Sequence, residues 1–188
     1  MGKIIVSENV TLDGVGQDPT GEEGFERGGW FARISDADRA AWAKVEQEEA
    51  MAAAAMLLGR RSHRWFADRW ATRTGDWADR LHAMPKYVVS ATMTDPGWAH
   101  TTILAGDAAT EVASLKATVD GDIVVYASRR LVHWLLAEDL VDELRLTVFP
   151  FLAGAGDRLL GPTPGAVPLT LADARPVGDQ LALLTYRA

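Results

Sequence analysis

The sequence predicts an α/β fold, with a mostly parallel sheet that ends in an antiparallel hairpin. Short runs rich in β-branched residues alternate with longer helix-compatible segments as far as Val148. Two further apolar runs then flank a four-residue turn at 177–180, which is the pattern of a hairpin. Parallel strands are joined by helical crossovers, so helices are expected on both faces of the sheet.

Each element can be placed along the chain. Helices are expected from Asp36 to about Met51, with Ser35 as N-cap, and again after Gly59. A long glycine-rich segment between residues 14 and 31 is typical of a lid or a binding loop. Strands are predicted at 3–7, 56–59, 86–90, 101–104, 122–126 and 142–149, further helices at 76–84, 108–119 and 131–137, and the hairpin at 169–176 and 181–187.

Composition limits the class of protein. A length of 188 residues with 48% apolar residues predicts one domain over 1–188 with a full core. The net charge of −7 argues against a general nucleic-acid binder. The absence of cysteine excludes disulfides and cysteine-ligated zinc, and the four histidines lack metal-site spacing, so no metal is expected. No leader-like segment or bilayer-length apolar run is found, so we expect a cytoplasmic protein with no membrane partner.

A strand-to-helix break at residues 59–62 is the most informative motif. Gly59 ends an apolar run, and Arg60, Arg61 and Ser62 open the helix that follows. The unpaired N–H groups of a helix start, together with guanidinium groups, favour an anion such as a phosphate. Taken alone, the motif is more typical of a surface turn with solvated arginines, because Gly-Arg-Arg-Ser is a weak motif.

Two other strand ends strengthen the case for a ligand. Ser90 closes one predicted strand, and Ala127, Ser128 and Arg129 follow another. Ligands of parallel sheets bind beyond the carboxyl ends of the strands, where these residues would gather. Three such ends in one sheet indicate a nucleotide with several phosphates. By contrast, residues 154–156 do not form a dinucleotide fingerprint and are expected to be a bend.

An ordered set of residues over nearly the whole chain resembles a known family. It resembles the dihydrofolate-reductase-like reductases, in the branch of the C-terminal reductase domain of bacterial riboflavin biosynthesis. The resemblance implies a three-layer α/β/α sandwich. The matching residues are 12–14, 28–30, 57–62, 86–90, 125–128 and 140–146, together with Ser7, Leu131, Pro150, Leu152, Gly154, Gly156, Arg158 and Leu159.

The resemblance also implies a function. It implies an NADPH-dependent oxidoreductase that passes hydride to a C=N or C=O group of a small heterocyclic substrate, pterin-like or ribosylaminopyrimidine-like. Dihydrofolate reductase and 5-amino-6-(5-phosphoribosylamino)uracil reductase are the models for it. By the same resemblance, the cofactor pyrophosphate binds at Gly59, Arg60, Arg61 and Ser62. By the same resemblance, Ser90 lies near the adenosine ribose and its 2′-phosphate, and Ala127, Ser128 and Arg129 face the phosphates and the nicotinamide side. The stretch from Asn9 to Val15 borders the nicotinamide.

The sequence departs from the family pattern at two places. Ala127 stands where the family usually has glycine, which lets the backbone approach the cofactor closely. The methyl group of Ala127 is expected to narrow the cofactor site there. The folate-reducing branch carries a buried carboxylate on the helix after the first loop, for which Asp38 is the nearest candidate. Asp36 and Asp38 also suit the first turn of a helix, and we favour that capping role. Asp13, Asp38 or a bound water are the candidate proton donors.

Three hypotheses remain for the structure or for experiment. Gly28 and Gly29 would let Trp30 fold inward as one wall of the substrate pocket. The closing hairpin would expose Leu181, Leu183, Leu184 and Tyr186, which predicts a two-fold homodimer that covers them. The alternative to an enzyme is a non-catalytic nucleotide-binding or interaction protein that retains the fold.

Overall fold

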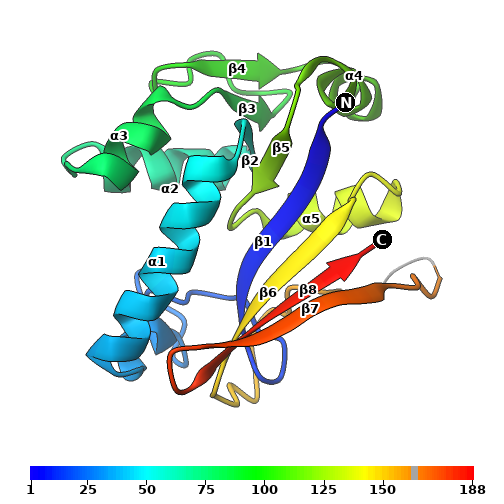
Figure 1. Cartoon of the computed structure of the whole chain (residues 1–188). Helices are drawn as coiled ribbons and strands as arrows, with labels where there is room; N and C mark the ends of the chain where they lie inside the picture. The colour runs from blue at the N-terminus through cyan, green and yellow to red at the C-terminus, as the bar shows by residue number, and fades with distance from the viewer. Residues whose placement is uncertain (162–164) are drawn as a thin grey trace.

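The computed structural model describes residues 1–161 and 165–188. Eight strands form one sheet in the order β4-β3-β2-β5-β1-β6-β8-β7 (Figure 1). The strands are β1 (Lys3–Thr11), β2 (Ala55–Gly59), β3 (Lys86–Val89), β4 (Thr101–Leu104), β5 (Asp122–Val125), β6 (Glu143–Phe149), β7 (Thr170–Val177) and β8 (Leu181–Arg187). The helices are the 3₁₀ helix η1 (Trp30–Arg33) and the α-helices α1 (Asp36–Ala52), α2 (Arg60–Trp70), α3 (Asp76–Ala83), α4 (Ala108–Thr118) and α5 (Arg129–Ala137).

The predicted fold class is confirmed. β1 pairs in parallel with β5 and β6, and β2 pairs in parallel with β3 and β5. β8 runs antiparallel to both β6 and β7, so the C-terminal hairpin forms one edge of the sheet (Figure 1). The crossover helices lie on both faces and give the three-layer sandwich.

Alternation along the central strands divides the core between the two faces. Ala55 and Leu57 of β2 pack in one cluster with residues of α4 and α5. Met56 and Leu58, between them in the chain, pack in the opposite cluster with residues of α1, α2 and α3. A third cluster lies under the hairpin and contains Trp30. The first four residues of β2 are all apolar and buried, which is the continuous apolar pattern expected of a strand covered on both faces.

The first strand is longer than its neighbour β5, and this difference creates an opening. β1 pairs with β5 only from Lys3 to Val6, whereas its pairing with β6 continues to Thr11. From Ser7 onward the β5 side of β1 therefore has no strand partner in the described part of the chain. Ser7, Glu8 and Asn9 border the cleft described below.

The structure moves several expected boundaries. β1 ends at Thr11 and not near Ser7, because β6 continues to pair with it. α5 begins at Arg129, two residues before the expected start, and η1 was not predicted. Ser35 caps α1 as expected, accepting the N–H of Asp38 at 3.1 Å. The loop expected around 161–165 lies partly outside the described residues.

The hairpin exposes less apolar surface than its sequence suggests. Leu181 and Leu183 are buried in the cluster around Trp30, and Leu184 and Tyr186 are half-buried. The outer edge is β7, exposed from Thr170 to Pro176. The homodimer stays a prediction.

Candidate functional site

A cleft of about 1110 Å³ lies beside the part of β1 that extends beyond its pairing with β5. Its floor is formed by residues 7–9 of β1 and by the carboxyl ends of β2 and β5. This is the position at which parallel sheets bind their ligands. Aromatic side chains form much of its wall, among them Phe31, Trp42, Trp65, Phe66 and Tyr126.

Two helices begin at one end of the cleft and are tied together there. The N–H of Gly59, before α2, donates to Ser128 Oγ, before α5, at 3.0 Å. Ser62 Oγ donates to the carbonyl of Ala127 at 2.5 Å. Neither helix receives a side-chain cap from the described residues, so first-turn N–H groups point at the cleft edge without a capping oxygen. We call residues 59–62 and 127–129 the cradle.

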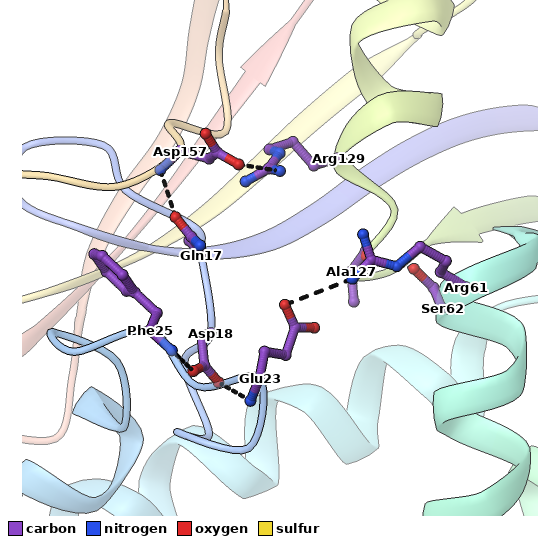
Figure 2. A network of polar contacts seen from close by, with 9 residues as sticks. All are labelled: Gln17, Asp18, Glu23, Phe25, Arg61, Ser62, Ala127, Arg129 and Asp157. Atoms are coloured by element: carbon purple, nitrogen blue, oxygen red, sulfur yellow. Dashed lines mark hydrogen bonds and ion pairs between the residues drawn. The ribbon is translucent and has the colours of Figure 1, made fainter.

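The cradle suits phosphate groups by its charge as well. Arg60, Arg61 and Arg129 all line the cleft. Arg61 Nη2 lies 3.9 Å from Glu23 Oε2, and Arg129 Nη2 lies 2.5 Å from Asp157 Oδ2 (Figure 2). Carboxylates from two loops thus hold two of the three guanidinium groups at the cleft mouth. A phosphate would meet the same donors with stronger, charge-assisted hydrogen bonds.

The long loop after β1 forms one wall of the cleft, held by the buried Asp18. Asp18 Oδ1 accepts the N–H of Glu23 and Oδ2 accepts that of Phe25, both at 3.0 Å (Figure 2). Gln17 Oε1 accepts the N–H of Asp157 at 2.8 Å, which joins this loop to the one after β6. The loop therefore presents Glu23 toward Arg61 in a fixed conformation.

The other end of the cleft carries an amide, an indole and a carboxyl group in one hydrogen-bonded set. Trp42 Nε1 lies 2.8 Å from Asn9 Oδ1 and 3.1 Å from Glu46 Oε1. Asn9 Nδ2 also lies 3.4 Å from Glu46 Oε1. Asn9 comes from β1, and Trp42 and Glu46 are one turn apart on α1. These contacts fix the carboxyl of Glu46 in the cleft wall.

Two carboxyl groups in the cleft have strongly raised pKa values. The pKa of Glu46 is raised to about 8, first by burial and then by the neighbouring Glu49, against the hydrogen bonds from Asn9 and Trp42. Burial likewise raises the pKa of Glu8 to about 8, opposed chiefly by the hydrogen bond from the Ser128 N–H. Both groups are therefore largely protonated at neutral pH and can donate a proton.

Asp13, a predicted proton donor, lies outside the cleft and is bound to backbone. Its Oδ1 accepts from Thr11 Oγ at 2.6 Å and from the N–H of Ala153 at 3.0 Å, and Oδ2 accepts the N–H of Gly154 at 2.8 Å. The hydrogen bond from Thr11 and then those from the backbone lower the pKa of Asp13 to about 2. An ionised carboxylate cannot donate a proton at neutral pH, so Asp13 is a structural residue.

Asp38, the other predicted donor, is also structural. It is buried away from the cleft, accepts from Ser35 Oγ at 2.7 Å, and receives the N–H of Asp179 at 2.7 Å. The hydrogen bond from Ser35, the largest cause, keeps its pKa below the usual value. The capping role favoured for Asp38 is confirmed by the Ser35 contacts, and Asp38 also fixes the β7–β8 turn.

The structure contradicts the pocket role predicted for Trp30. Its side chain is 1% exposed, is not part of the cleft wall, and packs edge-on against Phe31 and Phe149, with ring centroids 4.9 Å apart in each pair. Gly29 does turn the chain inward, with a φ of 72°, but the indole fills the core under the hairpin. It is a core residue because its large apolar area is better buried than placed at a cleft mouth.

Ser90 is not part of the cleft wall. Its Oγ accepts the N–H of Thr92 at 3.3 Å and that of Met93 at 3.1 Å, which closes the turn after β3. Arg60 Nη1 donates to Thr92 Oγ1 at 2.6 Å, so this turn orients a cradle arginine. The contact predicted between Ser90 and the 2′-phosphate stays a prediction.

Sequence reasoning missed Glu8, Trp42 and Glu46 as site residues. One signal was available: Glu8 is a charged residue close behind the β-branched run Ile4, Ile5 and Val6. Glu46 gave no signal, because α1 carries several acidic residues and their spacing does not show which one faces the cleft.

Neither a metal site nor a membrane span is found in the described residues. No group of three or more histidine, aspartate or glutamate side chains there could hold a metal ion. No helix in the same residues is long and apolar enough to cross a bilayer.

Several solved structures share the fold of this chain. A Shewanella sp. PV-4 protein assigned to riboflavin biosynthesis shares 20% sequence identity, with a TM-score of 0.71 and 98% of both chains covered. A Thermotoga maritima diaminohydroxyphosphoribosylaminopyrimidine deaminase/5-amino-6-(5-phosphoribosylamino)uracil reductase shares 14% identity, with a TM-score of 0.62 over 99% of this chain and 56% of its own. Acinetobacter baumannii RibD (form 1) shares 13%, with a TM-score of 0.66 over 100% of this chain and 58% of its own. At these identities the likeness shows the fold.

The family is shown by a sequence comparison. A search of curated proteins gave no significant match. The model of the RibD C-terminal domain, however, matches residues 2–183, which is nearly the whole chain. The chain therefore belongs to the RibD C-terminal domain family.

Proposed function

We propose that this protein is an NADPH-dependent reductase that transfers hydride to a C=N or C=O group of a small heterocycle. The observation that carries the proposal is one continuous cleft with two chemically different ends. The cradle offers arginines and helix starts that suit a dinucleotide phosphate. The opposite end offers aromatic walls and a protonated carboxyl. Membership of the RibD C-terminal domain family supports a nicotinamide cofactor.

The cradle residues would hold the cofactor. Arg60, Arg61 and Arg129 are placed for its phosphates, and Ser128 keeps the starts of α2 and α5 together. When bound, the nicotinamide supplies a hydride at low potential. The chain supplies orientation, a wall that excludes water, and the proton that hydride addition to C=N or C=O also needs.

Glu46 is the proton donor in this proposal. It takes the place that the family resemblance gave to Asp38, because both lie on α1 but only Glu46 faces the cleft. Trp42 and Asn9 orient its carboxyl. The O–H bond of Glu46 breaks as the substrate nitrogen or oxygen takes the proton, and solvent later reprotonates the carboxylate.

Titration with NADPH and NADH tests cofactor binding. Trp42 and Trp65 line the cleft, so binding should change tryptophan fluorescence. We expect saturable binding with NADPH tighter than NADH, because the 2′-phosphate adds negative charge that the arginine-rich cleft as a whole attracts. A flat signal with both nucleotides, checked by calorimetry, would reject the proposal.

Glu46→Gln tests the reduction step. With a panel of cyclic imines and ketones, we expect this change to lower kcat by roughly 10²-fold while NADPH affinity holds. Glu48→Gln is the matched control, because Glu48 lies on the same helix with its side chain 62% exposed.

The second candidate function is a nucleotide-binding protein without catalysis. Ala127 favours it, because a methyl group stands in the cradle at a φ of 48°, a backbone conformation suited to glycine. NADPH binding with no turnover of any cyclic imine or ketone in the panel would support this candidate over the reductase.

A further inference from the structure

Glu8 of β1 is tied to the cradle by hydrogen bonds. Its Oε1 accepts the N–H of Ser128 at 3.2 Å, and Ser128 Oγ in turn accepts the N–H of Gly59 at 3.0 Å. One chain of hydrogen bonds thus joins β1 to the starts of α5 and α2. Because β1 has no strand partner on this side after Val6 in the described residues, the side chain of Glu8 reaches the cradle directly.

The surroundings of Glu8 make its charge sensitive to what occupies the cradle. Glu8 is buried, with only 9% of the residue exposed. From α1, the like charge of Glu46 disfavours ionisation of Glu8, and from α5, Arg129 favours it. Arg145 on β6 does not offset this burial and repulsion, because its guanidinium group is already paired with two carboxylates. Arg145 Nη1 lies 2.7 Å from Glu49 Oε1, and Arg145 Nε lies 2.6 Å from Glu143 Oε1. The other charged or titratable groups among the described residues that line the cleft are Asp18, Glu23, Arg39, Arg60, Arg61, Arg64, Arg69, Arg73, Tyr126 and Arg130.

We propose that Glu8 is a positioning residue that couples occupancy of the phosphate cradle to retention of a proton on its own carboxyl. This inference rests on the proposed function. The neutral carboxyl keeps an oxygen that accepts the Ser128 N–H and brings no charge near the phosphates. An ionised Glu8 would repel them across a short, poorly solvated gap. By linkage, an anion in the cradle must then raise the proton affinity of Glu8 by the same factor.

The coupling has a consequence for the reaction. Reduction of C=N or C=O consumes one proton for each hydride, and the cofactor brings only the hydride. A cofactor that holds the proton on Glu8 as it binds keeps negative charge away from its own phosphates, while Glu46 remains the donor of the proton that the reduction consumes. The raised pKa of Glu8, about 8, puts the transition in an accessible pH range.

Binding of NADPH at pH 7 and pH 9 tests the coupling. The 2′-phosphate is already doubly ionised over this range, so its own titration does not contribute. For the parent protein we expect the affinity to fall about threefold to tenfold between pH 7 and pH 9. Glu8→Gln keeps an oxygen for the Ser128 N–H and cannot ionise, so it should bind like the parent at pH 7 and lose little at pH 9. Glu48→Gln on exposed α1 surface is the control and should follow the parent.

Two further arms separate this inference from the proposed function. Glu8→Ala removes the acceptor for Ser128 and should weaken binding at both pH values, whereas Glu8→Gln restores it. Inorganic pyrophosphate probes the cradle alone: in ¹³C-glutamate-labelled protein it should raise the pH at which the Glu8 carboxyl titrates. If NADPH fails to bind while pyrophosphate shifts this titration, the reductase proposal falls and the coupling stands. A parent affinity equal at pH 7 and 9, or a fall that persists in Glu8→Gln, overturns the coupling.

Discussion

Ser128 Oγ accepts the N–H of Gly59 at 3.0 Å, joining residues 69 positions apart in the chain. Each lies immediately before a helix, so one hydrogen bond sets the spacing of two helix starts. Gly59 is the last residue of β2, and its N–H has this hydroxyl as acceptor. The cradle therefore depends on a tertiary contact and on the local strand-to-helix turn together.

Ser128→Ala should loosen the cradle. The Gly59 N–H loses its acceptor, which costs roughly 1–3 kcal/mol when a donor is left unsatisfied. We expect a corresponding fall in the free energy of unfolding and NADPH binding weakened by about tenfold. Urea unfolding and fluorescence titration measure the two effects. Ser114→Ala, on the exposed side of α4, should change neither, and unchanged NADPH affinity in Ser128→Ala would argue against this role.

Arg60→Ala or Arg61→Ala should weaken NADPH binding by about tenfold or more, since hydrogen bonds to charged groups contribute roughly 1.5–3 kcal/mol. The loss should shrink at high salt, because the contacts are partly screened. Thermal stability should barely change, as both side chains are exposed at the cleft. Arg175→Ala, on the outer strand β7, is the matched control. Parent-like binding by both cradle variants would place the phosphates elsewhere.

Trp30→Ala should act on stability and not on the cleft. Removing a large buried side chain lowers the free energy of unfolding by about 3–5 kcal/mol. Below the melting temperature, NADPH affinity should match the parent, because Trp30 is not part of the cleft wall. Trp65→Ala, in that wall, should show the opposite pattern. Weaker binding in Trp30→Ala without a loss of stability would restore its predicted pocket role.

Asp13 should contribute to stability mainly above pH 4. Its folded pKa, about 2, lies below the ordinary value of 3.8, so the unfolded state binds more protons between these values. The stabilisation is full above pH 4 and is lost as the pH falls toward 2. In Asp13→Asn, urea midpoints should drop at pH 6 but approach those of the parent at pH 2.5. Parallel curves for both proteins would contradict this.

Ala127→Gly should improve cofactor binding at little cost in stability. Glycine relieves the left-handed strain at a φ of 48°, about 1 kcal/mol, and loses a similar amount through the freer unfolded chain. Without the methyl group, the phosphates can approach the backbone more closely. We expect NADPH affinity to rise while the urea midpoint stays near that of the parent. Weaker binding would mean that Ala127 helps to hold the loop in place.

Local sequence patterns were enough to predict the fold and the position of the cradle. Alternating strand and helix patterns predicted a parallel sheet with a hairpin, and the structure has it. Gly59, Arg60, Ser62 and Ser128 could be placed in the cradle because their role depends on strand ends, which local patterns mark. Chain-wide similarity to the RibD C-terminal domain supported the same assignment.

Which acidic and aromatic residues face the cleft depends on how distant parts of the chain pack together. Asp13, Asp38 and Trp30 are of residue types that suit a site. In the fold, however, Asp13 accepts the N–H groups of Ala153 and Gly154, and Asp38 accepts that of Asp179. Trp30 packs against Phe149 in the core. Glu8 and Glu46 become acids because burial raises their pKa values, and burial depends on how β1 and α1 pack. The opening itself exists because β1 is paired five residues further with β6 than with β5, a difference in length that no local pattern encodes.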